Sequence, residues 1–264
     1  MSQNFLDMIT AATRERVARV RSDSYAQALH KKAERSRSSR RPHMFREALS
    51  GVERTNIIAE IKRASPSKGV INANLDAAAQ ARRYAAGGAA AISVLTEPDH
   101  FQGAITDLLK VREAVDLPLL RKDFIVDGFQ IIEAAAAGAD AILLIVAALE
   151  QNELSSLRTF AEDELGLDAL VEIHDADELA RAVDAGASII GVNNRNLHSL
   201  EVSLDTSRQL AASKPANSIF VAESGLSSRA EIDELREAGF DAFLIGETLM
   251  RSGDPASDLE ELGA

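Results

Sequence analysis

From Ile57 onward the chain repeats one pattern, in which a short run of β-branched residues and leucine is followed by an alanine-rich stretch. Such apolar runs are typical of strands buried on both faces, and the stretches between them have the apolar spacing of amphipathic helices. The predicted strands are Ile57–Lys62, Ala91–Thr96, Pro118–Phe124, Ala141–Ala147, Ala169–His174, Ile189–Asn194, Ile219–Ser224 and Ala242–Glu247. The predicted helices are Leu75–Ala86, Ile105–Ala114, Phe129–Ala137, Asn152–Leu165, Ala176–Ala185, Thr206–Ala212, Arg229–Ala238 and Pro255–Leu262. Strands that alternate with helices form parallel sheets, because a parallel neighbour requires a crossover.

A short sequence motif repeats within the chain and indicates a fold built from similar units. Four Ala-Gly pairs end predicted helices directly before strands, at intervals of roughly fifty residues: Ala86-Gly87, Ala137-Gly138, Ala185-Gly186 and Ala238-Gly239. Glycine at such a position fits a left-handed helix cap. Eight strand–helix units in about 210 residues predict an α/β fold, a (β/α)8 TIM barrel. An open doubly wound sheet is the alternative, but it normally has a glycine-rich turn where this chain has Ser65-Pro66-Ser67-Lys68-Gly69.

The first fifty residues differ in composition and predict a helical extension before the barrel. We expect one domain, 1–264, of which 1–50 is this extension. Apolar residues recur at helical spacing, and they must be buried against something: Phe5, Met8, Ile9, Ala12 and Val17. A basic tract runs from His30 to Arg46. A solvated helix face that connects to the barrel is the simplest interpretation of the tract, and a nucleic-acid arm or a cationic flap near an anionic ligand are the alternatives.

Composition limits the partners. The net charge of -12 argues against binding of nucleic acid or an anionic membrane by the whole surface, although a local cationic pocket for a small anion is compatible with it. The chain has no cysteine, which excludes disulfides, thiolate metal sites and cysteine nucleophiles. The N-terminus lacks the continuous apolar region of a signal peptide, and no run approaches the roughly 18 apolar residues of a membrane span. We therefore expect a cytoplasmic protein.

The first predicted strand carries two charges on one face. Side chains two apart on a strand point the same way, so Glu60 and Lys62 share the face of Ile58. Burying an unpaired charge costs free energy, so the two charges are expected to have either an ion-pair partner or a function. Taken alone, the strand is equally compatible with a simple ion pair at a strand end.

Polar groups also end most of the other predicted strands. The C-terminal strand ends form the active face of such a barrel, so we expect these groups to converge on one mouth. Lys122 shares a face with Leu120 and Phe124, and Glu172 shares a face with Leu170 and His174. The remaining groups at strand ends are Asn193, Arg195, Glu223, Ser224, Gly225, Gly246 and Glu247. Small residues after the last two strands let backbone N–H groups approach a phosphate, which predicts a phosphate site there.

We find no pattern for a metal or a dinucleotide in the sequence. The histidines are His30, His43, His100, His174 and His198, and none has a second histidine or carboxylate at ligand spacing. Only His174 falls in a predicted strand, where a strand-end or helix-capping role is the simplest interpretation. We therefore predict no metal site.

Seven segments at the predicted strands form a distinctive set of motifs: Glu60–Gly69 (EIKRASPSKG), Ser93–Gly103, Leu119–Ile145 (with RKDF), Leu170–Leu179 (LVEIHDADEL), Ile189–Leu197 (IIGVNNRNL), Val221–Leu226 (VAESGL) and Phe243–Met250 (FLIGETLM). In these segments the chain resembles a known family, indole-3-glycerol-phosphate synthase of tryptophan biosynthesis. The resemblance spans all eight predicted strands and includes the helical extension.

The resemblance implies a reaction and a set of roles. The reaction closes the pyrrole ring of 1-(2-carboxyphenylamino)-1-deoxyribulose 5-phosphate, releases carbon dioxide and water, and needs no cofactor. By motif position, Lys122 is the general acid, and Glu172 and Lys62 transfer protons, with Glu60 orienting Lys62. We expect neighbouring cations and partial burial to lower the pKa of Lys122. The resemblance also implies that Asn193 and Arg195 hold the substrate and neighbouring carboxylates. The implied substrate-binding residues are Ser65, Phe124, Arg195, Glu223, Ser224, Gly225, Gly246 and Glu247. Many members have serine at position 247, so the backbone N–H rather than the side chain of Glu247 is expected to bind phosphate.

The resemblance further implies that the extension lies beside the mouth and helps to cover the substrate, where the basic tract would attract a doubly anionic ligand. The expected partner is a phosphorylated small molecule, with no nucleic acid and no membrane. We also expect a monomer or weak homo-oligomer, with contact to other enzymes of tryptophan biosynthesis. The alternatives are a sugar-phosphate isomerase or aldolase and a non-catalytic anion-binding barrel. An isomerase would require one acid/base pair and no second lysine.

Overall fold

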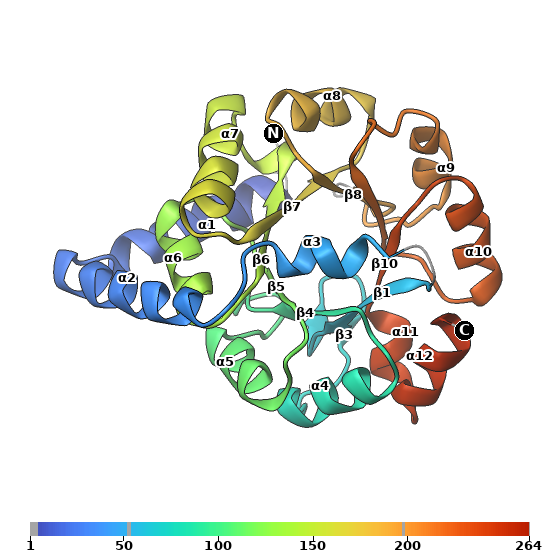
Figure 1. The fold of residues 1–264 in the computed structure, drawn as a ribbon, viewed down its shortest axis with the longest axis horizontal. Helices are drawn as coiled ribbons and strands as arrows, with labels where there is room; N and C mark the ends of the chain where they lie inside the picture. Colours follow the sequence, from blue (N-terminus) through green and yellow to red (C-terminus); the bar gives the residue numbers. More distant parts are fainter. Residues whose placement is uncertain (1–4, 52–53, 197–198, 264) are drawn as a thin grey trace.

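The chain folds into a closed parallel barrel, seen down its axis in Figure 1. This computed structural model describes residues 5–51, 54–196 and 199–263; Leu197 and His198 of the sequence analysis lie outside them. The eight barrel strands of this described part are β1 (Asn56–Ile61), β4 (Ala91–Leu95), β5 (Leu119–Lys122), β6 (Ala141–Ile145), β7 (Asp168–Ile173), β8 (Ile189–Asn193), β9 (Ile219–Glu223) and β10 (Ala242–Ile245). They are hydrogen-bonded in chain order, and β1 pairs with both β4 and β10 to close the ring. The predicted TIM barrel is therefore confirmed, and the open sheet is excluded.

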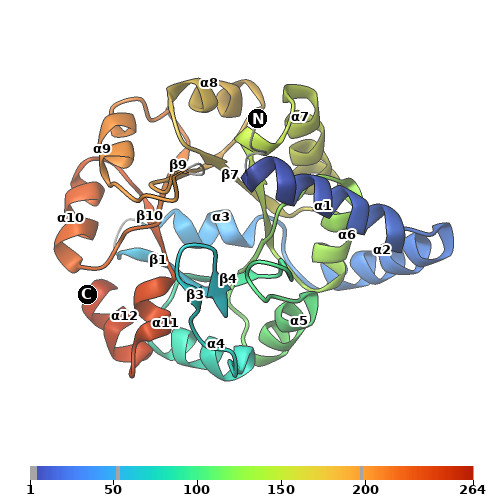
Figure 2. The ribbon, with the colours of Figure 1, turned by 180° about the vertical axis from the view of Figure 1, so that it is seen from behind.

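Helices follow the strands and surround the barrel (Figures 1 and 2). They are α4 (Ala77–Ala86), α5 (Ile105–Ala114), α6 (Gly128–Ala136), α7 (Gln151–Thr159), α8 (Ala176–Asp184), α9 (Asp205–Ala211), α10 (Arg229–Glu237), α11 (Glu247–Arg251) and α12 (Pro255–Gly263). A 3-10 turn, Val146–Ala148, follows β6, and α7 continues into a π-helical turn, Phe160–Glu164. A small hairpin of β2 (Ala64–Ser65) and β3 (Gly69–Val70) follows β1. Neither this hairpin nor α11 was predicted from the sequence.

Every barrel strand ends one or two residues before its predicted end. β5, for example, ends at Lys122, so Phe124 lies in the loop beyond it. The polar residues at these positions thus occupy the last paired position or the loop that follows. Polar side chains begin two of the helices, since Asp175 and Ser228 accept from backbone N–H groups of α8 and α10.

The expected left-handed helix cap is wrong for the first of the four Ala-Gly pairs, Ala86-Gly87. Gly138, Gly186 and Gly239 have positive φ angles, as a left-handed cap requires, but Gly87 has φ -80° and the left-handed residue is Gly88. Position 87 requires glycine for a reason other than its backbone conformation. A Cβ there would lie 2.6 Å from the backbone oxygen of Ala256, so α12 can approach α4 only because residue 87 has no side chain.

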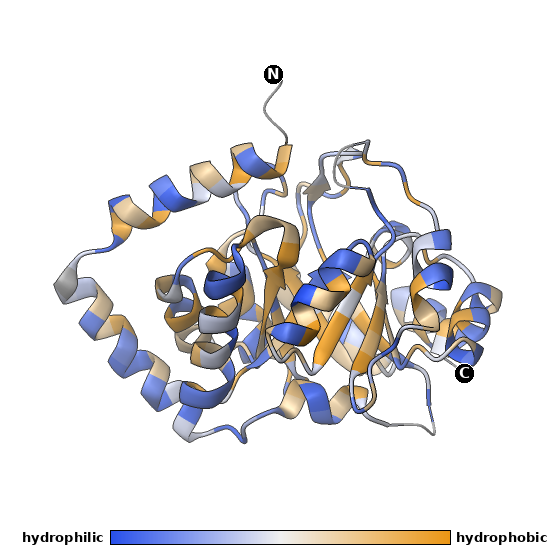
Figure 3. Cartoon of the chain, turned by 90° about the horizontal axis from the view of Figure 1, so that it is seen from above, coloured by the Kyte–Doolittle hydropathy of each residue, from blue (hydrophilic) through white to orange (hydrophobic). Residues whose placement is uncertain are grey.

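Two apolar layers hold the barrel together. Side chains alternate along each strand, so every second residue points into the lumen. The inner layer includes Ile58, Leu120, Leu170, Val221 and Leu244. The outer layer packs the opposite strand faces against the surrounding helices, with residues such as Ile92, Leu144, Val171 and Phe243. The orange strands enclosed by mixed-colour helices in Figure 3 show this arrangement.

The extension consists of α1 (Phe5–Val20), α2 (Asp23–Ser38) and α3 (Met44–Leu49). It runs from one end of the barrel to the other, as Figure 3 shows from the side. α1 lies at the C-terminal ends of the strands, where Phe5 and Leu6 line the central cavity. α2 packs along α6. α3 closes the opposite end, where Phe45 and Leu49 are fully buried against the inner layer.

The buried face of α1 differs from the expected one. Leu6, Ile9, Thr13 and Val17 are its buried residues, whereas Met8 is 42% exposed and Ala12 is also exposed. Thr13 was not recognised because it is polar, yet it belongs to the same helical stripe.

The basic tract does not form a cationic flap at the mouth. Arg37 and Arg40 of this tract bind Asp140, a fully buried residue directly before β6 and therefore at the end of the barrel away from the mouth. Arg112 of α5 binds the same carboxylate, and Arg37 also donates to the carbonyl of Gly166. The tract thus anchors α2 to the barrel. No helix in the part of the chain that the structure describes is long and apolar enough to cross a membrane.

Candidate active site

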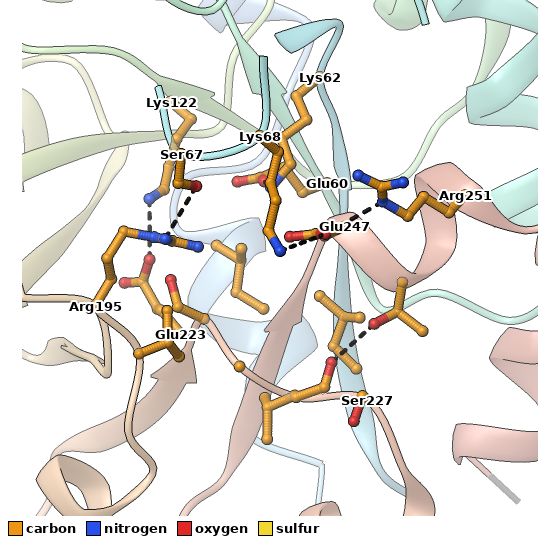
Figure 4. A pocket seen from close by; sticks show the side chains of 18 of the residues that line it. Glu60, Lys62, Ser67, Lys68, Lys122, Arg195, Glu223, Ser227, Glu247 and Arg251 are labelled. Carbon is orange, nitrogen blue, oxygen red and sulfur yellow. Dashed lines mark hydrogen bonds and ion pairs between the residues drawn. The ribbon is translucent and has the colours of Figure 1, made fainter. Parts of the chain in front are cut away.

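Three charged residues from different strands meet inside the C-terminal mouth of the barrel, and Figure 4 shows two of them, Lys122 and Glu223. The ammonium of Lys122, at the end of β5, lies 3.2 Å from Glu172 Oε2 and 3.0 Å from Glu223 Oε2. Glu172 and Glu223 belong to β7 and β9, and both are buried. The alternation of the strands, which points Leu120, Leu170 and Val221 inward two residues earlier, places these groups in one lumen.

A second pair stands beside them. Lys62, just after β1, donates to Glu60 Oε1 at 2.7 Å, and both side chains are largely buried. Gly246, at the end of β10, lies directly against this pair, because a Cβ at residue 246 would clash with the Glu60 carboxylate and come within 2.8 Å of Lys62 Nζ. Glycine at position 246 therefore makes room for the charges.

Asn193 and Arg195 link the carboxylates to the loops above. Asn193 Nδ2 donates to Glu172 Oε1 at 3.1 Å, and its own oxygen accepts the backbone N–H of Arg195. The guanidinium of Arg195 donates to Ser67 Oγ at 3.1 Å and to the carbonyl of Leu200. Arg195 thus joins the loop between β2 and β3 to the loop that follows β8.

Two connected compartments open from this cluster. The larger, of about 690 Å³, is the more polar of the two and extends toward the ends of β9 and β10. The smaller, of about 130 Å³, reaches under α1 and is walled by apolar side chains: Phe5, Leu6, Pro66, Leu95, Phe101, Phe124, Leu143 and Ile145. Glu60, Lys62, Lys122, Arg195 and Ser224 line both compartments. The charges therefore stand between an apolar space and a polar one.

The pKa of Lys122 departs from the expectation. Burial opposes its charge, but the carboxylates of Glu223, Glu172 and Glu60 outweigh burial and hold its pKa well above the ordinary value. The expected lowering of the pKa by neighbouring cations is thus wrong for the free site, because the nearest partners of Lys122 are anions. Lys122 is protonated at neutral pH.

The carboxylates differ from one another. Burial and the nearby Glu172 and Glu60 raise the pKa of Glu223 to about 7, although Lys122 opposes this. For Glu172, burial is outweighed by Lys122, His174 and Asn193, which lower its pKa. Glu60 also has a lowered pKa, since Lys62 and Lys122 outweigh its burial. At neutral pH the mouth therefore holds two ionised carboxylates and one that can exchange a proton.

The polar compartment ends at backbone groups that suit an anion. Ser224 and Gly225, directly after β9, both have positive φ, 65° and 86°, and turn the chain sharply at the rim. Gly246 precedes the first turn of α11. Lys68 and Arg251 also line this end, and the carboxylate of Glu247 binds both, at 3.6 Å and 3.2 Å. The loops after these two strands are where barrels of this kind bind phosphate.

His174 has neighbours that the sequence did not indicate. It follows β7 and lies with Nδ1 3.0 Å from Glu178 Oε2 of α8, and with Nε2 3.5 Å from Glu172 Oε1. After burial, which opposes its charge, Glu172 and Glu178 are the main influences, and they raise its pKa to about 10. The strand-end position was expected, whereas the contact with Glu172 was not.

The structure brings all the predicted site residues to the two compartments. Glu223, Gly225, Gly246 and Glu247 line the polar one, and Ser65, Phe124, Glu172 and Asn193 line the apolar one. Six further residues that line the compartments were not predicted from the sequence: Ser67, Lys68, Arg251, Phe101, Phe5 and Leu6. Ser67 and Lys68 are polar residues of the loop after β1, which was a usable signal. Leu6 gave none, since it resembles any apolar helix residue. No group of three or more potential metal-binding side chains is arranged to hold an ion among the residues that the structure describes.

Comparison with known proteins decides the family. The sequence profile of the family described as indole-3-glycerol phosphate synthase matches residues 6–262. The chain belongs to this family. Relatives named indole-3-glycerol phosphate synthase include those of Koribacter versatilis, 51% identical over 237 residues, and Polynucleobacter asymbioticus, 44% identical over 266 residues. The first alignment covers 88% of this chain and 90% of the relative, and the second covers 99% of each.

Solved structures of other proteins share the fold of this indole-3-glycerol phosphate synthase family member. The 3-hexulose-6-phosphate synthase of Salmonella typhimurium superposes with a TM-score of 0.63 at 14% identity, over 79% of this chain and 96% of the other. A thiamine phosphate pyrophosphorylase of Pyrococcus furiosus gives a TM-score of 0.58 at 18% identity, over 79% and 93%. At these identities the likeness concerns the barrel alone.

Proposed function

We propose that this chain closes the pyrrole ring of 1-(2-carboxyphenylamino)-1-deoxyribulose 5-phosphate to give indole-3-glycerol phosphate, as an enzyme of tryptophan biosynthesis and a carboxy-lyase. One observation carries the proposal beyond family membership. Two lysines and three glutamates stand between an apolar compartment and a polar one that ends at an anion-binding rim. A substrate with an aromatic ring at one end and a phosphate at the other matches that division.

The substrate is oriented by its two ends. The benzoate ring fits beside Phe101 and Phe124 under α1, where apolar walls favour an aromatic group. The phosphate lies at the rim formed by Ser224, Gly225 and the start of α11. Lys68 adds a cation there, once the phosphate replaces the carboxylate of Glu247 as its partner. The ketone carbon then falls between Lys122 and Lys62.

Ring closure requires a proton donor at the ketone oxygen. The aromatic carbon that bears the carboxylate attacks the ketone carbon, and Lys122 protonates the oxygen as it becomes a hydroxyl. Lys122 is the assigned donor because its raised pKa keeps it protonated in the free site. Glu223, which has a pKa of about 7 and lies 3.0 Å away, is the assigned source of the proton that restores Lys122.

Carbon dioxide is lost next, and water after it. Loss of the carboxylate restores the aromatic ring, so this step needs little beyond positioning by the cations of Lys62 and Arg195. The hydroxyl then leaves as water when an acid protonates it, while a base removes the proton from the neighbouring carbon. Glu172 and Lys62 are the assigned residues for these two transfers. The hydrogen bonds of Lys62 to Glu60 and of Asn193 to Glu172 support Glu60 and Asn193 as the residues that orient them.

The test is a direct assay. The purified chain is incubated with the carboxyphenylamino substrate in a buffer containing EDTA, and indole-3-glycerol phosphate and carbon dioxide are measured. Equal molar amounts of both products are expected. Absence of product under conditions where the chain is folded would refute the proposal. Turnover of sugar phosphates instead would support an isomerase or aldolase, and tight substrate binding without turnover would support an anion-binding barrel.

We also propose that the extension and the barrel form one domain, 1–264. α1 and α3 contribute buried side chains to the mouth and to the inner layer, which supports this.

The chain is proposed to work in the cytoplasm as a monomer or weak homo-oligomer, in contact with other enzymes of the pathway. Large exposed apolar side chains lie apart on α1, α2, β3 and α8, for example Met8, Tyr25, Val70 and Val183. Sedimentation across a range of concentrations tests the oligomeric state.

A further inference from the structure

A pair of residues outside the two compartments contacts the reacting cluster from behind. His174 and Glu178 line neither compartment, and their side chains are only 14% and 17% exposed. Glu178 Oε2 accepts the backbone N–H of His174 at 2.8 Å and lies 3.0 Å from its Nδ1. These two contacts from one carboxylate fix the ring between α8 and the end of β7.

The other face of the ring is turned to Glu172. His174 Nε2 is buried without a hydrogen-bond partner and lies 3.5 Å from Glu172 Oε1. Both ring nitrogens thus face carboxylates, which accept hydrogen bonds but cannot donate them when ionised. A neutral imidazole would turn a lone pair toward one of them, so the doubly protonated ring fits both contacts.

We propose that Glu178 and His174 act as positioning residues, which hold the carboxylate of Glu172 ionised and aimed at the reacting groups. The inference rests on the proposed function, because Glu172 is assigned there to proton transfer. Glu172 Oε1 is then shared between His174 and Asn193, while Oε2 faces Lys122. Because three residues contact the carboxylate of Glu172, the positions of its two oxygens are fixed before the substrate binds.

The charges around the pair determine how it responds to pH. His174 faces Glu172 of β7 and Glu178 of α8, and Glu172 in turn faces Lys122 of β5 and Asn193 of β8. Glu60 and Glu223 act on the same cluster through Lys122. Removing the charge of Glu178 takes away one of the two anions beside His174, so the ring loses its proton at a lower pH. A neutral ring then no longer stabilises ionised Glu172.

The experiment compares Glu178→Gln with the wild type and with His174→Asn. Glutamine keeps an oxygen that can accept from His174 but has no charge. In Glu178→Gln, kcat at pH 9 relative to pH 7 is expected to fall on the order of 10-fold compared with the wild-type ratio, at nearly constant KM. In His174→Asn, kcat falls about 10-fold at both pH values, since no ring remains to titrate. A loss of structure alone would not create a new decrease of kcat at alkaline pH.

The chain provides a matched control. His30 and Glu34 form the same i, i+4 pair at 3.6 Å on the exposed surface of α2, so Glu34→Gln should leave the pH profile unchanged. The histidine ring signals are also followed by NMR, with His174→Asn identifying the His174 signal. That signal should remain protonated to above pH 9 in the wild type, and titrate at lower pH in Glu178→Gln.

The outcomes separate this inference from the proposed function. A Glu178→Gln profile that superposes on the wild type, or a wild-type His174 that titrates near 6.5, would overturn the positioning role. If the wild type makes no indole-3-glycerol phosphate, the proposed function fails, and the NMR titration still decides whether the pair exists. If His174→Asn does not fold, the pH profile of Glu178→Gln compared with the wild type decides alone.

Discussion

Lys122 and Glu223 form an ion pair across the full width of the barrel. Their strands, β5 and β9, are four positions apart in either direction around the closed ring, yet Nζ and Oε2 are separated by only 3.0 Å. An open sheet of the same strands would leave these side chains apart. Closure of the barrel is therefore what creates the acid/base cluster.

Replacing Lys122 tests the assigned general acid. Lys122→Ala should lower kcat on the order of 10²-fold or more, while the substrate still binds through its phosphate and ring. The variant should also be less stable, because Glu172 and Glu223 lose their shared cation. Steady-state kinetics and urea unfolding measure the two effects. Lys110→Ala, an exposed lysine of α5, serves as the control, and near-normal turnover of Lys122→Ala would contradict the role.

Glu223 should give the chain a distinctive dependence of stability on pH. Its pKa is about 7 when folded and 4.5 ordinarily, so between these values the folded chain retains a proton that the unfolded chain has released. The contribution of this group to stability therefore falls as pH rises from about 4.5 to 7. Glu223→Gln should remove that fall. Urea unfolding of both proteins at pH 5 and pH 7.5 checks it, and an unchanged difference between the two pH values would contradict the raised pKa.

A substitution at Gly225 tests the phosphate rim. Gly225 has φ 86°, and a Cβ there would lie 2.6 Å from Val202 Cγ1, so Gly225→Ala should displace the rim and raise KM roughly tenfold. The fall in kcat should be smaller, because phosphate is bound alike in the ground and transition states. Gly253→Ala is the control, since a Cβ there meets no atom within 4 Å. A crystal structure with bound phosphate away from Ser224, Gly225 and Gly246 would exclude this site.

Asp140 should be among the most sensitive positions for stability. It is fully buried and binds Arg37, Arg40 and Arg112 as well as the backbone N–H of Leu119. Asp140→Asn removes the charge that compensates these cations, and a loss of about 3–5 kcal/mol in the free energy of unfolding is expected. Asp233→Asn, which breaks an exposed pair with Arg229, should change it by less than about 1 kcal/mol. Equal losses in the two variants would contradict the argument.

Truncation separates the two parts of the extension. Deletion of residues 1–21 removes α1, with Phe5 and Leu6, from the apolar compartment and should raise KM while the barrel stays folded. Deletion of residues 1–44 also removes Arg37 and Arg40, and should lower stability in addition. Kinetics and thermal unfolding of both truncations test this. An unchanged KM in the shorter deletion would mean that α1 does not cover the substrate.

The sequence allowed prediction of what depends on local periodicity. The eight strands, their order and the inward face of Glu60, Lys122 and Glu172 follow from the repeat of two along a strand and from the alternation with helices. The closeness of Lys122 to Glu223 depends on strands about a hundred residues apart, so the raised pKa of Lys122 did not follow from its own neighbours. The partners of Arg37 and Arg40 are equally distant in sequence, which is why charge composition alone suggested a solvated helix face or a flap rather than an anchor.

The path of the extension has a consequence for synthesis on the ribosome. α3 is made before any strand, yet Phe45 and Leu49 are buried in the same inner layer as Ala242 and Leu244 of the last strand. α1 likewise lies over a mouth that exists only when β10 has joined β1. Helices α1 and α3, which are translated before the strands, therefore complete their packing last. Their apolar faces remain unburied until β10 has been synthesised.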